Sequence, residues 1–181
     1  MSALAPTIAF VPSVITTYGA IHTAISCVPL FLGGYLYLTK GTIRLDTELG
    51  RIYFWTALAG AVTGITIFHH GGPGIPHIVS ALFIILLLAA AGAKVLTFTR
   101  LKARTIEIVS LSFTYFFVWF FTTTEGLTRL PAGKPFSPSP EAIELAPVRG
   151  ALLLVLIVGI WWQLRAEKRR AAFPVDAAPA E

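Results

Sequence analysis

Charged side chains are scarce in this sequence. They make up 13% of its 181 residues, whereas a soluble domain carries about 25% and a disordered chain has still more charge and fewer aromatic residues. Both of these classes are therefore excluded. Because 55% of the residues are hydrophobic and the mean hydropathy is +0.75, the composition predicts an integral membrane protein in a lipid bilayer.

Cysteine is almost absent as well. The single residue Cys27 lies in an apolar run, which excludes an intramolecular disulfide. The sequence also lacks Cys-x-x-Cys, Cys-x-x-Cys-His for covalent haem, a glycine-rich phosphate loop and a Gly-x-Ser-x-Gly elbow, so no motif supports soluble-enzyme chemistry. The net charge of +5 does not indicate a nucleic-acid partner, because the basic residues form short clusters beside apolar runs.

Long apolar stretches dominate what remains. A helix of about 20 residues crosses the hydrocarbon core of a membrane, so these stretches predict an all-α integral membrane bundle of five transmembrane helices. We expect one domain over residues 1–170, followed by an Ala- and Pro-rich tail over 171–181. The predicted spans cover about residues 13–38, 51–69, 76–96, 105–124 and 148–164.

The lysine and arginine residues predict the orientation of this bundle. Eleven of the fourteen flank the first connection, the third connection and the end of the last span, whereas only Arg129, Lys134 and Arg149 lie on the other side. Basic residues are retained on the cytoplasmic side of a membrane. We therefore expect the N-terminus outside and the C-terminus in the cytoplasm.

All four histidines fall near the predicted outer surface. His69 and His70 close the second span and His77 opens the third, across a short turn rich in Gly and Pro that holds the two helix ends together. Imidazole is the commonest metal-binding side chain and suits haem iron, copper and zinc. The alternative is that these residues are polar caps at the membrane interface. Neighbours in a helix point about 100° apart, so at most one of His69 and His70 faces the core.

His22 lies inside the first apolar span, where an ionisable group is costly and usually faces the bundle or a cavity. Its helical face is otherwise made of small or packable residues, which suits either a planar cofactor or a close helix neighbour. The two interpretations are a haem or metal ligand and a hydrogen-bonded core histidine. A b-type haem held by His22 and a histidine of the second or third span is the sharpest hypothesis.

Carboxylates offer fewer candidates. Glu125 ends the fourth span at the level of the histidines, as a possible proton acceptor or quinone site; an ion pair with Arg129, one turn further on, is the simpler explanation. Glu107 is expected to pair with Arg104. In the second span, the Gly60-x-x-x-Gly64 motif predicts a helix-packing surface.

Part of the chain, from Tyr18 to about Ala93, resembles an uncharacterised family of bacterial predicted multi-span membrane proteins. The resemblance rests on the histidine of the first span, on Gly33-Gly34 and on the segment Leu49-Gly50-Arg51-Ile52-Tyr53. Where that family has a His-Arg pair, this chain has Asp46-Thr47, so a function carried by that histidine is not expected here. The resemblance implies a multi-span helical fold and a location in the bacterial inner (cytoplasmic) membrane.

Two functions are compatible with these features. The first is a small electron-transfer or cofactor-holding membrane subunit. It would bind b-type haem, or copper or zinc, through His22 and one of His69, His70 and His77, and exchange electrons with a quinone or an external redox partner. The second is a cofactor-free accessory subunit that stabilises a larger complex of membrane subunits. The sequence leaves open whether the protein is an enzyme.

Overall fold

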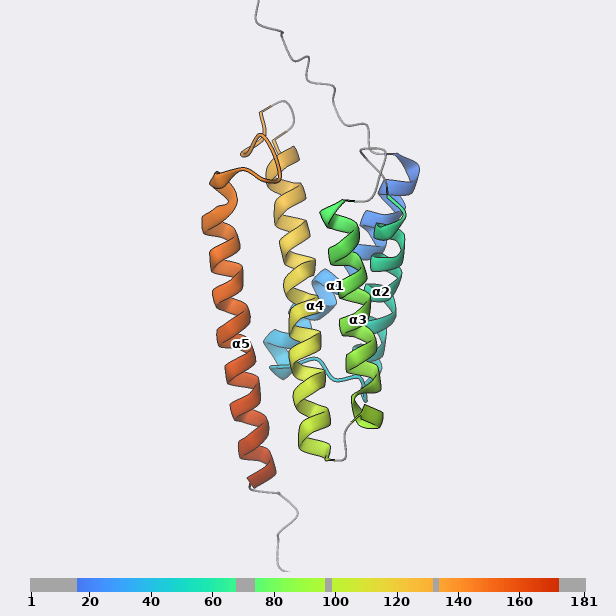
Figure 1. The fold of residues 1–181 in the computed structure, drawn as a ribbon, viewed down its shortest axis with the longest axis vertical. Helices are drawn as coiled ribbons and strands as arrows, with labels where there is room; N and C mark the ends of the chain where they lie inside the picture. The colour runs from blue at the N-terminus through green and yellow to red at the C-terminus, as the bar shows by residue number, and fades with distance from the viewer. Residues whose placement is uncertain (1–15, 68–73, 97–98, 132–133, 173–181) are drawn as a thin grey trace, which may run out of the picture.

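The computed structural model describes residues 16–67, 74–96, 99–131 and 134–172, and all regular structure within these ranges is helical. The helices run along one another in a single bundle (Figure 1). The all-α prediction is therefore confirmed for the described residues. The elements are α1 (Thr17–Lys40), α2 (Glu48–Ile65), α3 (Ile75–Leu96), α4 (Arg100–Arg129), the short 3-10 helix η1 (Ile143–Leu145) and α5 (Ala146–Ala172).

Four of these helices are long and apolar enough to cross a membrane: α1, α3, α4 and the segment formed by η1 and α5. The exception is α2, which has 18 residues and therefore a length of about 27 Å. It begins earlier than predicted, because Thr47 caps it by accepting a hydrogen bond from the Gly50 amide (3.1 Å). Its first turns consequently include Glu48 and Arg51, which lower its apolar character.

Consecutive helices pack against each other, and α1 also contacts α4, whereas α5 packs mainly against α4. Small residues allow close approach at the α1–α2 contact, where a side chain at Gly60 would meet the Ser26 hydroxyl at 3.1 Å. On α3, Ala90 and Ala93 are buried. The prediction that Gly60 and Gly64 lie on a helix-packing surface is confirmed, since both face side chains of neighbouring helices.

The helix directions divide the bundle into two ends (Figure 1). At the end that we call the basic end, α1 ends, α2 begins, α3 ends, α4 begins and α5 ends. The eleven basic residues grouped in the sequence lie at or near these helix ends. The opposite end, which we call the histidine end, contains His22 near the start of α1 and His77 near the start of α3.

Polar side chains also connect the helices inside the bundle. The Tyr53 hydroxyl lies 3.0 Å from the Thr114 hydroxyl, and both residues are fully buried. Gln163 of α5 donates to the Ser112 hydroxyl (3.0 Å), which also lies 3.3 Å from the hydroxyl of Tyr37. Lipid chains offer no hydrogen-bond partners, so polar side chains in an apolar environment bond to one another. These bonds link α1, α2 and α5 to α4.

Candidate functional site

His22 is half-buried at the contact between α1 and α2. Its Nδ1 lies 2.8 Å from the hydroxyl oxygen of Thr63. Thr63 is held in turn by its own helix, because its hydroxyl donates to the carbonyl oxygens of Ala59 (2.9 Å) and Gly60 (3.0 Å). The α2 helix therefore fixes one nitrogen of the imidazole ring.

The protonation of His22 is linked to the Thr63 hydroxyl, which has one hydrogen and lies within hydrogen-bond distance of two α2 carbonyl oxygens. When this hydrogen is directed to the α2 backbone, Nδ1–H of His22 donates to Thr63 and neutral His22 keeps its lone pair on Nε2. Nε2 makes no hydrogen bond to the described part of the chain and is not enclosed by it. This is the state in which imidazole binds a metal ion.

Three helices meet beside the His22 ring, at Gly64 of α2. A side chain at Gly64 would lie 3.3 Å from Cε1 of His22 and 3.5 Å from the Ser80 hydroxyl of α3. Because Gly64 has no Cβ, the imidazole can lie against the α2 backbone. The glycine therefore sets how deeply His22 sits between the helices.

His77 has the opposite hydrogen-bonding pattern. The Gly74 amide donates to its Nδ1 (3.0 Å), so neutral His77 carries its proton on Nε2. The lone pair on its Nδ1 accepts from the backbone amide that precedes α3, as expected for a residue that caps this helix. His69 and His70 lie outside the described residues, so a ligand pair across the turn between α2 and α3 stays a prediction.

Glu125 pairs with Arg129, as expected from their spacing of one helical turn. Arg129 Nε lies 2.6 Å from Glu125 Oε2, and both side chains are at least one-third exposed. Glu125 is also close enough to His22 to interact with it electrostatically. The Glu125 carboxylate thus places a negative charge near the His22 imidazole. Its principal contact is the ion pair with Arg129.

Metal ligands are not gathered in the part of the chain that the structure describes. Within those ranges no group of three or more His, Cys, Asp or Glu residues is placed to hold a metal ion. His22 therefore does not belong to a cluster of three or more such side chains within the described ranges. A haem iron needs only one or two protein ligands, whereas a structural zinc site needs four.

A second cluster of charged groups lies at the basic end, and the sequence predicted only part of it. Arg104 is 5% exposed and forms ion pairs with Glu107 (2.8 Å) and with Glu167 of α5 (3.7 Å). It also donates to Thr42 Oγ1 (3.0 Å) in the α1–α2 connection. The pair with Glu107 confirms the expectation from spacing. The contribution of Glu167, sixty residues away in the chain, had no local signal.

Comparison of the chain with protein-family models, with curated proteins and with solved structures finds no match. The resemblance to an uncharacterised bacterial family thus stays a prediction.

Proposed function

We propose that this protein is a small membrane electron-transfer subunit in which His22 binds b-type haem through Nε2. The observation that carries this proposal is the 2.8 Å hydrogen bond between Nδ1 of His22 and the Thr63 hydroxyl, which engages one ring nitrogen and leaves Nε2 without a hydrogen bond in the described part of the chain. When bound, haem iron would supply a reversible one-electron change.

His22 and its neighbours have separate roles in this proposal. His22 supplies the ligand nitrogen, Thr63 orients the ring and Gly64 leaves space beside it. His69, His70 or His77 would hold the haem together with His22. For His77 to bind through Nε2, its Nδ1 would first have to release the Gly74 amide. The electron would pass to a quinone or an external redox partner.

The proposal predicts a haem signal that depends on His22. The protein purified from haem-supplied cells should show b-type bands in a reduced-minus-oxidised visible spectrum. His22→Ala should abolish or shift them. Thr63→Val should weaken haem binding by about 10- to 100-fold, because the loss of a partner that orients a ligand has effects of that size.

The matched control for Thr63→Val is Thr56→Val, on the same helix. The Thr56 hydroxyl donates to the Ile52 carbonyl (2.7 Å) and makes no contact with His22, so this variant should bind haem as the parent does. Folded, monodisperse protein without haem bands and without copper or zinc by metal analysis would contradict the proposal. It would favour the cofactor-free accessory subunit of a larger membrane complex instead.

We further propose that all five helices cross the bacterial inner membrane, with the histidine end outside. The concentration of basic residues at the opposite end supports this orientation. In a Cys27→Ala background, Glu141→Cys should react with a membrane-impermeant maleimide added to whole spheroplasts. Lys168→Cys near the end of α5 should react only after lysis. The reverse labelling pattern would invert the orientation.

A further inference from the structure

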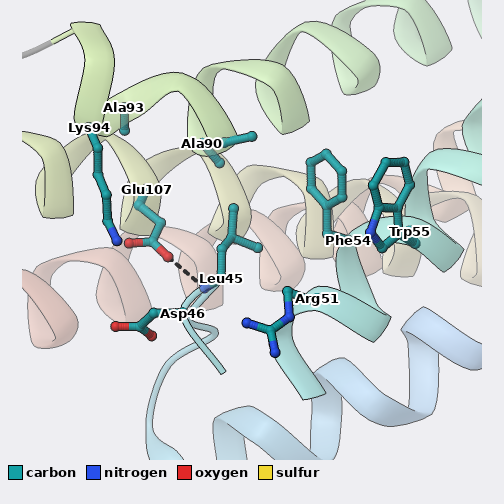
Figure 2. A pocket seen from close by; sticks show the side chains of 10 residues that line it. Leu45, Asp46, Arg51, Phe54, Trp55, Ala90, Ala93, Lys94 and Glu107 are labelled. Carbon is teal, nitrogen blue, oxygen red and sulfur yellow. Dashed lines mark hydrogen bonds between the residues drawn. The ribbon is translucent and has the colours of Figure 1, made fainter. Parts of the chain in front are cut away.

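A cleft of about 280 Å³ opens at the basic end between α2, α3 and the α1–α2 connection. Figure 2 shows Arg51 on α2 and Lys94 on α3 approaching it from different sides, with Leu45 and Asp46 between them. Its wall also includes Trp55 and Glu107. The cleft is separate from the His22 region, which lies at the other end of the bundle.

The two carboxylates of the cleft are already neutralised by other residues. Asp46 accepts two hydrogen bonds from Arg44, at 3.0 and 2.6 Å. These bonds hold the pKa of Asp46 below its ordinary value, so it stays ionised and bound to Arg44. Glu107 is paired with Arg104 (2.8 Å) and accepts a hydrogen bond from the Leu45 amide (2.7 Å). Both acids are therefore held by the fold.

The two cations of the cleft have no such partners. Neither the Arg51 nor the Lys94 side chain forms a hydrogen bond or an ion pair within 4 Å in the described ranges, and both residues are exposed. Lys94 contributes only a longer-range attraction to Asp46. Two positive groups on different helices thus face one cleft without a bound counter-charge.

An adjoining surface indicates what kind of anion would fit. A second, more open cleft of about 530 Å³ shares Arg51 and Trp55 with the first and continues along α2 over Ile52 and Thr56. Trp55 is 64% exposed and Ile52 is 41% exposed. Glu48 also lines this surface, at the first turn of α2. The cleft that holds the two cations therefore continues into a helix face on which Ile52 and Trp55 are exposed.

We propose that this cleft binds an anionic phospholipid, with its phosphate between Arg51 and Lys94 and its acyl chains along Ile52 and Trp55. Guanidinium and ammonium groups pair with phosphate. Basic pockets between transmembrane helices are suited to anionic headgroups, and an aromatic ring is favoured at the level where headgroup and chains meet. The bound lipid would fill the cleft between α2 and α3 at the basic end.

Native mass spectrometry of the detergent-purified protein tests this site, with phosphatidylglycerol as the probe and phosphatidylcholine as the neutral comparison. The parent should retain phosphatidylglycerol in preference to phosphatidylcholine. The double variant Arg51→Gln/Lys94→Gln should bind phosphatidylglycerol about 10- to 30-fold more weakly, since each basic residue near an anionic surface contributes about fivefold.

The control variant is Lys168→Gln/Arg169→Gln, which removes the same charge from the exposed end of α5. It should keep parental binding, as should the charge-preserving Arg51→Lys/Lys94→Arg variant. If the glutamine pair fails to fold, the single variants Arg51→Gln and Lys94→Gln should each weaken phosphatidylglycerol binding about fivefold. An equal loss of phosphatidylglycerol binding in the cleft variant and the control variant would overturn the proposal. So would equal retention of both lipids, or full displacement of phosphatidylglycerol by millimolar inorganic phosphate, which would identify a soluble anion instead.

Discussion

Replacing Arg104 by leucine should lower the free energy of unfolding by about 3–5 kcal/mol, because two mostly buried carboxylates lose their nearest cation. Within 4 Å in the described ranges, Glu167 then keeps only Arg170 (4.0 Å). Arg104 is the only cation within 4 Å of Glu107 in the described ranges, and it joins Glu107 to Glu167 across α4 and α5. The side chains of these acids are 13% and 19% exposed. Titration with a denaturing detergent in mixed micelles, monitored by the helical circular dichroism signal, would measure the loss of unfolding free energy.

Two comparisons identify the cause of this loss. Arg129→Leu removes an ion pair of α4 whose side chains are 36% and 54% exposed, so it should cost no more than about 1 kcal/mol. The triple variant Arg104→Leu/Glu107→Gln/Glu167→Gln should recover stability, because glutamine is neutral and keeps an oxygen for the Leu45 amide. If Arg104→Leu were as mild as Arg129→Leu, the acids would not depend on Arg104.

Gly50→Ala should destabilise the protein by about 3 kcal/mol or more, because a backbone atom occupies the place of the new side chain. A Cβ at Gly50 would lie 1.8 Å from the carbonyl oxygen of Arg44. That oxygen accepts hydrogen bonds from the amide (3.2 Å) and hydroxyl (2.8 Å) of Thr47, the N-cap of α2. The substitution therefore forces the connection away from the helix start.

The control for Gly50→Ala is Gly159→Ala in the middle of α5. Apart from its chain neighbours and the backbone of its own helix, no described atom lies within 4 Å of a Cβ at Gly159, and alanine favours a helix over glycine by about 1 kcal/mol. This variant should be as stable as the parent or more stable in the same titration. Equal stability of the two alanine variants would show that the α1–α2 connection at Arg44 moves aside without loss of stability.

Local patterns predicted much of the fold. The apolar stretches indicated five helices because lipid forces every backbone group to bond within its own segment, and four of them are confirmed as long and apolar enough to span. The pairs Arg104–Glu107 and Glu125–Arg129 were predictable because residues three or four apart share a helix face. The boundaries were less accurate. Thr47 starts α2 early, and α4 and α5 extend beyond the predicted spans 105–124 and 148–164.

The candidate sites were less predictable, because they depend on which helices become neighbours. The sequence by itself determined that the chain is apolar enough for a membrane, where its helices lie and that His22 is inside one of them. Only the tertiary structure decided that Thr63 bonds to Nδ1 of His22, that Glu167 meets Arg104 and that Arg51 and Lys94 share a cleft. Periodicity acts along one helix, whereas these contacts join residues tens of positions apart.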